Sequence, residues 1–220
     1  NALGACTTGE QNCAVGTGAC KTITTTSYNT ALGQNAMGSG AGGQENTAIG
    51  FEALKACTTG VEQVAVGSYA LGKSTDGTRN VAVGRQALYE NTTGYYNVAM
   101  GFEAMEASTD GHSNTAIGYH ALKVSTGGDN NTVLGYRAGY EISTGNHNTI
   151  IGRQAGNSLT TGGYNIMIGS GNATNAANNS NQITIGADVT GKGSYYTTFG
   201  TNANGRVYNY YPSNATWTRD

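Results

Sequence analysis

The sequence has few prolines and few charged residues. A single proline accompanies 35 glycines among 220 residues, which excludes a collagen helix, because collagen needs abundant proline and a glycine at every third position. Charged residues make up 11% of the chain, against ~25% in ordinary domains. The 11 Lys and Arg do not exceed the 13 Asp and Glu, so the basic surface of a nucleic-acid-binding domain is missing. No apolar run approaches the ~18 residues of a membrane-spanning helix, so neither nucleic-acid binding nor membrane insertion is expected.

Glycine is abundant instead, and it is periodic. One glycine recurs at every seventeenth position, and each repeat unit is numbered here so that this glycine is position 5. These glycines are Gly16, Gly33, Gly50, Gly67, Gly84, Gly101, Gly118, Gly135, Gly152, Gly169 and Gly186. Position 1 is always an amide: Asn12, Asn29, Asn46, Gln63, Asn80, Asn97, Asn114, Asn131, Asn148, Asn165 and Gln182. Eleven units in one unbroken register indicate a repeat architecture.

Each unit predicts one short strand and one turn. Positions 2 and 4 are mostly apolar or β-branched, as in Val81 and Val83, and a period of two places them on one face. We expect this face to be interior. The expected interior ladder consists of Val15, Ile49, Val83, Ile117 and Ile151. The T-T-G and T-D-G triplets at positions 13–15, such as Thr58 to Gly60, predict turns whose glycine has a positive φ.

The predicted fold is therefore all-β, a parallel β-solenoid (β-roll) of 17-residue coils. Stacking at ~4.8 Å buries the face that a single coil leaves exposed. We expect the amides to hydrogen-bond to one another along the rod and the position-5 glycines to permit close backbone approach. The structural ladders include Asn46, Asn80, Asn114, Ile49, Val83, Ile117, Gly50, Gly84 and Gly118. We assign residues 1–190 to the repeat shaft or head and residues 191–220, which are rich in aromatics, to a C-terminal cap or tip.

Two positions of the unit vary together. In three units position 3 grows from Ala to Val133, Ile150 and Met167, and position 9 shrinks in the same units to Gly139, Gly156 and Ala173. Because the total volume is roughly kept, we infer that positions 3 and 9 share one interior or one interface.

Alanine at position 3 also suggests an oligomer. Ala31, Ala48, Ala65 and Ala82 lie on the face opposite the position-4 ladder. A thin coil needs this second face covered, and small residues allow chains to approach closely. We therefore expect a parallel, side-by-side homotrimer.

The repeat resembles two known groups of proteins. From Asn46 to Leu54, Asn80 to Leu88 and Asn114 to Leu122, the pattern N-[TV]-A-[IV]-G-x-x-A-L resembles the head repeats of trimeric autotransporter adhesins. It equally resembles repeats in bacteriophage tail fibres and tail spikes. The resemblance covers roughly residues 1–190, and it implies parallel β-rolls, left-handed in those adhesins, with three chains side by side.

The C-terminal segment carries a second resemblance. Residues Asn204 to Asp220 are similar to the stretch that precedes the self-cleaving intramolecular chaperone domain of tail fibres. The resemblance implies that a chain ending at Asp220 is a mature product. It also implies a place in the tail fibre of a virion, an extracellular particle that is assembled in the host cytoplasm.

Residue patterns for catalysis are sparse. The pair of carboxylates that hydrolyses glycosides lies ~5–9.5 Å apart, whereas Glu52 and Glu103 share a unit position three coils, or ~14 Å, apart. The three histidines, His112, His120 and His147, lack the spacing of metal ligands. We expect a protein that is not an enzyme and that has no cofactor or metal.

The four cysteines do not suggest a disulfide framework. Cys6 and Cys57 share a unit position but lie three coils apart, which exceeds the reach of a disulfide. We expect free thiols that act as small hydrophobes, as Cys20 would at position 9, consistent with assembly in a reducing cytosol.

Candidate receptor-binding residues fall in two places. On the shaft, positions 6 and 7 vary most, and Phe102, Tyr119 and Tyr136 would stack on successive coils beside Arg137. This strip suits either a glycan- or protein-binding surface or a seam between subunits. At the tip, the candidates are Tyr211, Trp217, Arg206 and Arg219, with a cap that has no receptor role as the alternative.

We expect a non-enzymatic fibre that reaches and binds a host surface, with itself (as a homotrimer) and a host-cell glycan or protein as partners. A bacterial trimeric surface adhesin and a polysaccharide depolymerase are alternatives. An ice-binding solenoid is a further alternative, because Thr115, Thr132 and Thr149 form a ladder at position 2, although Val64, Val81 and Val98 interrupt it.

Overall fold

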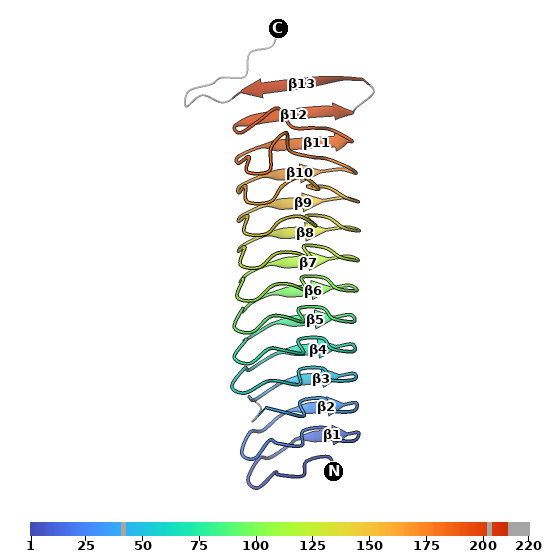
Figure 1. Cartoon of the computed structure of the whole chain (residues 1–220), viewed down its shortest axis with the longest axis vertical. Helices are drawn as coiled ribbons and strands as arrows, with labels where there is room; N and C mark the ends of the chain where they lie inside the picture. The colour runs from blue at the N-terminus through green and yellow to red at the C-terminus, as the bar shows by residue number, and fades with distance from the viewer. Residues whose placement is uncertain (41–42, 202–203, 211–220) are drawn as a thin grey trace.

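The chain forms a rod of stacked coils. The computed structural model describes residues 1–40, 43–201 and 204–210. Figure 1 shows a single column of strands in chain order, with the N-terminus at one end of the rod and the last strand at the other. The strands are β1 (Cys13–Val15), β2 (Thr30–Leu32), β3 (Thr47–Ile49), β4 (Val64–Val66), β5 (Val81–Val83), β6 (Val98–Met100), β7 (Thr115–Ile117), β8 (Thr132–Leu134), β9 (Thr149–Ile151), β10 (Ile166–Ile168), β11 (Ile183–Ala187), β12 (Tyr196–Thr201) and β13 (Asn204–Tyr210).

The pairing register confirms the predicted coil length. From β1 to β11 each strand pairs in parallel with the next, and partner residues are one repeat apart, as Thr115 is from Thr132 and Thr132 is from Thr149. No helix occurs in residues 1–40, 43–201 or 204–210, so none of the described segments offers a helix that could cross a membrane. The all-β parallel solenoid predicted from the glycine period is confirmed.

The side of the strand that faces the interior is the reverse of the expectation. Position 4 does form an aligned ladder, with Ile49 beside Val66 and Val83 beside Met100. The position-3 alanines from β2 to β7, however, have no exposed surface, whereas Val15 at position 4 is 56% exposed. The predicted interior ladder of Val15, Ile49, Val83, Ile117 and Ile151 therefore lies on the outside of the chain. The alanines expected to cover a chain contact lie inside: Ala31, Ala48, Ala65 and Ala82.

The buried amide explains this inversion. Positions 1 and 3 share a face, and the position-1 side chains are buried together with Ala at position 8 and Leu or Met at position 9. Each amide bonds to the next coil: Asn114 Oδ1 accepts hydrogen bonds from the backbone N–H of Asn131 at 2.9 Å and from its Nδ2 at 3.1 Å. The expected amide ladder is confirmed, and its hydrogen bonds require the face of positions 1 and 3 to point inward.

The glycines at positions 5 and 15 both lie against a backbone carbonyl of the next coil, but only those at position 5 have a positive φ. Gly50 at position 5 has φ +134°, and a Cβ there would lie 2.6 Å from the carbonyl oxygen of Gly67 in the next coil, so close approach is confirmed. At position 15 the expectation of a positive φ is wrong. Gly111 lies outside the left-handed region, and it is glycine because a Cβ would lie 2.8 Å from the carbonyl oxygen of Gly128.

Left-handed backbone occurs instead at residues with side chains. Glu52, Leu54 and Glu62 at positions 7, 9 and 17 have φ between +49° and +56°, close to the values of their counterparts in other coils. Leu54 donates its N–H to the Ala70 carbonyl of a neighbouring coil at 2.9 Å, and Glu52 donates to the Gln34 carbonyl at 3.0 Å. Stacking thus stabilises a conformation that is otherwise uncommon for non-glycine residues.

The covariation of positions 3 and 9 has a direct structural cause. A Cβ on Gly156 would lie 2.8 Å from Ile150 Cδ1, and one on Gly139 would lie 3.4 Å from Val133 Cγ1. The larger strand residue fills the space that Leu or Met occupies in other coils. Positions 3 and 9 therefore share the interior, as inferred.

The sheet changes at its C-terminal end. β12 pairs with β11 in parallel, but the coil between them is shorter than those of the shaft, because Ile183 pairs with Thr197 instead of reaching Gly200. β13 then returns antiparallel to β12 as the last strand of the same sheet. The shortened coil and the reversed strand set this end apart from the shaft.

Candidate functional site

The outer face of the sheet is a continuous apolar and hydroxyl stripe. Positions 2 and 4 of β1 to β10 all point outward and are half-buried or exposed. Among the position-4 residues, Met100 is 41% exposed and Leu134 44%. We call positions 2 and 4 of β1 to β10 the outer stripe. A continuous stripe of exposed apolar side chains is typical of a contact surface.

Beside the outer stripe, the aromatic residues at position 6 form the stack that the sequence predicted. The Phe102 and Tyr119 rings lie 5.4 Å apart, and the Tyr119 and Tyr136 rings 5.2 Å, with interplanar angles of 10° and 8°. Arg85 and Arg153, also at position 6, bracket the stack, at 5.3 Å from the Phe102 centroid and 6.0 Å from the Tyr136 centroid.

This geometry limits what the stack can bind. Each face of the Tyr119 ring is covered by a neighbouring ring, so Tyr119 offers a ligand only its edge and hydroxyl. Stacking of a sugar on an aromatic face, which an isolated exposed ring would permit, is blocked here. The arrangement favours alignment of the coils or contact with a protein surface.

A charged cluster lies next to the stack at positions 7 and 10. His120 Nε2 is 3.0 Å from Glu103 Oε2, and Lys123 Nζ hydrogen-bonds to the same carboxylate. The side chains of Glu103 and His120 are each only 15% exposed. A second carboxylate, that of Glu106, is 3.9 Å from Lys123. The cluster joins adjacent coils through one central carboxylate.

The titration behaviour of the cluster follows from burial and charge. Burial and the Lys123 ammonium lower the pKa of His120 despite the adjacent carboxylate, so the imidazole is neutral at pH 7. Burial by itself raises the pKa of Glu103, but the hydrogen bond and charge of Lys123 outweigh it and hold that pKa below its ordinary value. The hydrogen bond to Glu103 raises the pKa of Lys123. Glu103 is therefore ionised at neutral pH, which does not suit a general acid.

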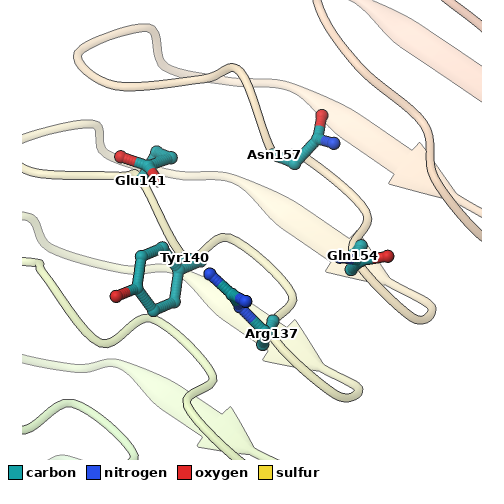
Figure 2. A pocket seen from close by; sticks show the side chains of 5 residues that line it. All are labelled: Arg137, Tyr140, Glu141, Gln154 and Asn157. Atoms are coloured by element: carbon teal, nitrogen blue, oxygen red, sulfur yellow. The ribbon is translucent and has the colours of Figure 1, made fainter.

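One cavity of about 210 Å³ opens at the end of this cluster. It is lined by Arg137, Tyr140 and Glu141 from the coil after β8 and by Gln154 and Asn157 from the coil after β9 (Figure 2). The Arg137 guanidinium lies over the Tyr140 ring, 4.4 Å from its centroid. We call this cavity the Arg137 pocket.

The backbone of the Arg137 pocket is fixed by the coil stacking. Arg137 and Gln154 both have left-handed φ, +52° and +53°. Each donates its N–H to the preceding coil at 2.8 Å, Arg137 to Tyr119 and Gln154 to Tyr136. The two position-7 side chains are thus held on adjacent coils at the mouth of the cavity.

Sequence reasoning found part of this site. Arg137 was among the candidate residues and does line a cavity. The tip residues Tyr211, Trp217 and Arg219 lie outside the described residues, and Arg206 belongs to β13, whose side chains are not described. Sequence reasoning missed Tyr140 and Asn157. The signal available was the repeat spacing, which places position 10 of one coil beside position 10 of the next.

A second column of rings lies at positions 16 and 17. Tyr95 stacks on His112 at 4.5 Å, and His147 stacks on Tyr164 at 4.6 Å. Two of the three histidines are therefore engaged with tyrosine rings. No group of three potential metal ligands was found in the part of the chain that the structure describes.

Comparison of the chain with protein-family models, curated proteins and solved structures finds no match.

Proposed function

We propose that this chain is a non-enzymatic fibre segment of a phage tail fibre, which holds and presents a host-binding surface as a parallel homotrimer. The rod supplies reach, and three copies of each weak contact raise the avidity for a cell surface without requiring a strong single site. The expected partners are two further copies of the chain and a host glycan or surface protein.

The outer stripe is the observation that supports the trimer. It presents aliphatic and β-branched residues along β1 to β10, and a continuous exposed apolar surface indicates a contact. Identical chains match one another in coil spacing along the whole stripe, so every position-4 residue can meet a counterpart at the same height. The proposed interface is therefore the outer stripe, in place of the buried alanines.

Two measurements test the proposal. Light scattering of the purified chain is expected to give three times the mass of one chain. Ile117→Lys with Ile151→Lys places two charges on the outer stripe and is expected to give monomers. Thr93→Lys, at an exposed turn position away from the stripe, is expected to leave the trimer intact. A stable monomer before any substitution contradicts the trimer.

Adhesion is tested separately. Labelled trimer is expected to bind cells of some strains in a panel of bacteria and to compete there with intact particles. If the trimer binds no strain to which the intact particles bind, the adhesion role is wrong. The fibre architecture is not affected by that result.

One observation favours an ice-binding solenoid as a second candidate. The outward direction of positions 2 and 4 presents Thr-x-Ile or Thr-x-Leu on several coils, including Thr115 with Ile117 and Thr149 with Ile151. Val at position 2 in β4, β5 and β6 interrupts the threonine column. A thermal-hysteresis assay on the wild type separates this candidate from the fibre, because an ice-binding stripe must be free in the active protein and cannot be covered in a trimer.

A further inference from the structure

We propose that the Arg137 pocket binds a neutral sugar residue, which makes it the glycan subsite of the adhesive fibre described above. The inference rests on the proposed adhesion function for its biological role, whereas the binding itself can be measured on the isolated chain.

The polar groups of the pocket are unused. Among the described residues, the side chains of Glu141, Gln154 and Asn157 make no hydrogen bond or ion pair with one another or with other side chains. The Arg137 guanidinium is likewise unpaired among them and lies over the Tyr140 ring. Polar side chains that line a cavity and have no partner within the chain can orient a small ligand.

Glu141 differs in this respect from most glutamates of the shaft. Several of those are paired with cations, among them Glu90 with Lys73 at 2.7 Å, Glu62 with Arg79 at 2.8 Å, and Glu52 with Lys55 at 3.0 Å. Arg137 and Glu141 line the same cavity yet lie beyond ion-pair distance of each other. The space between them admits a ligand group that accepts from the guanidinium and donates to the carboxylate.

The chemistry of these groups favours a polyol. A hydroxyl both donates and accepts, so neighbouring hydroxyls of one sugar ring can accept from Arg137 and donate to Glu141. The amides of Gln154 and Asn157 can likewise donate and accept. One positive and one negative side chain balance, which removes any advantage for an anionic ligand.

The size of the cavity agrees with this assignment. Sites for drug-sized ligands span ~300–1,000 Å³, so about 210 Å³ holds a smaller group, such as one sugar ring at the end of a longer chain. Because Arg137 covers one face of the Tyr140 ring, recognition would depend on hydrogen bonds more than on ring stacking.

The experiment uses the full chain and defined probes. Saturation-transfer NMR is run with the methyl glycosides of glucose, galactose, mannose and N-acetylglucosamine, and with glucuronate and glycine as anionic and zwitterionic competitors. At least one neutral glycoside is expected to bind, and Glu141→Ala and Asn157→Ala are expected to weaken it by at least about tenfold, since each removes a ligand hydrogen bond. Glu10→Ala, an exposed glutamate near the N-terminal end of the rod, is the matched control and should not change binding.

Three outcomes overturn the inference: no neutral glycoside binds, binding is unchanged in both pocket variants, or glucuronate or glycine binds more tightly than every neutral glycoside. Adsorption to cells separates the two proposals. If glycoside binding is lost in Glu141→Ala but adsorption is untouched, the sugar site stands and its adhesive role fails. If the wild type adsorbs to cells and binds no glycoside, the adhesive role stands and the sugar site fails.

Discussion

At the scale of single residues, the buried amides form the polar core of the rod. Asn114 Nδ2 donates to the Gly128 carbonyl at 2.7 Å and to Asn97 Oδ1 at 3.2 Å, and its Oδ1 receives both donors of Asn131. Each such amide therefore serves both neighbouring coils. A side chain without these groups would leave backbone donors and acceptors buried and unpaired.

Asn114→Ala is expected to lower the free energy of unfolding by about 2–6 kcal/mol, because an unpaired buried polar group costs ~1–3 kcal/mol and two are created. Asn114→Gln should cost less, since the chain itself has a buried amide of this length at Gln63. Denaturant melts of both variants check this. Equal loss in the two variants would contradict the role of the amide ladder.

The position-5 glycines have no room for a side chain. Gly50→Ala adds a Cβ 2.6 Å from the Gly67 carbonyl oxygen at φ +134°, so we expect a loss of several kcal/mol from steric overlap and backbone strain. Gly127→Ala is the matched control, because its Cβ meets only the Asp110 carboxylate, at 3.0 Å, and its φ is not left-handed. Thermal midpoints should fall clearly for the first variant only.

The cysteine thiols differ in burial, and their reactivity should differ accordingly. All four are free, Cys13 is exposed, and burial, with smaller contributions from Cys6 and Cys13, raises the pKa of Cys20 to about 11. Because the thiolate is the reactive form, iodoacetamide at pH 8 should label Cys20 only after unfolding, whereas Cys13 on the outer stripe should be labelled without unfolding in the monomeric variant Ile117→Lys with Ile151→Lys. Mass spectrometry of the labelled peptides checks this, and rapid native labelling of Cys20 would contradict the buried position.

At the scale of elements, the cluster of Glu103, His120 and Lys123 couples the stacking of adjacent coils to pH. The pKa values of both Glu103 and His120 are held below their ordinary values of 4.5 and 6.5. The unfolded chain therefore binds more protons as the pH falls, and stability is lost on acidification. His120 is the first to reduce the free energy of unfolding, as the pH falls through 6.5. Glu103 reduces it further below pH 4.5.

His120→Gln should flatten the loss of thermal stability between pH 7.5 and 5.5. The substitution is tolerated by the coil, because Gln86 and Gln154 occupy the same position with the same left-handed φ. His112 and His147 remain in both proteins, so the difference isolates His120. A wild type and variant with parallel pH profiles would contradict a buried neutral imidazole.

The strands and the coil spacing could be predicted from the sequence, but the inner face of the strands could not. The glycine period predicted the strands, the coil spacing and the stack of Phe102, Tyr119 and Tyr136, because each depends only on residues one repeat apart. Alternation placed positions 2 and 4 together but could not say which face is inside. That choice is made by the buried amide, which needs a carbonyl partner supplied by the position-15 turn of its own repeat unit.

The Arg137 pocket was beyond sequence reasoning for a different reason. It is formed where turns of adjacent coils leave a gap, and the turn shape depends on left-handed φ at Arg137 and Gln154. Neither residue type favours that conformation, so no local pattern predicts it. The conformation results from hydrogen bonds to the neighbouring coil, which are known only once the stacking is known.

At the scale of the whole molecule, the length of the rod is set by the number of coils, and one coil can be removed without changing how the others stack. Deleting Gln63–Arg79, one full repeat, joins Glu62 to Asn80 in register, so the rod should fold with a thermal midpoint within a few degrees of the wild type. Deleting Gln63–Asn80 instead shortens one coil by a single position and removes its amide, and the midpoint should fall sharply. Equal behaviour of the two deletions, measured by circular dichroism, would contradict the strict repeat register.

The direction of the hydrogen bonds has a mechanical consequence. The backbone bonds between successive coils, such as that from Thr115 to Asn131 at 2.8 Å, run along the rod, so a load applied at its two ends pulls on them one coil at a time. A coil that yields releases one repeat of chain, or about 50–55 Å after subtracting its stacked rise, while the remaining coils keep their shape. Under tension a rod built this way lengthens in repeated small steps and dissipates energy at each one.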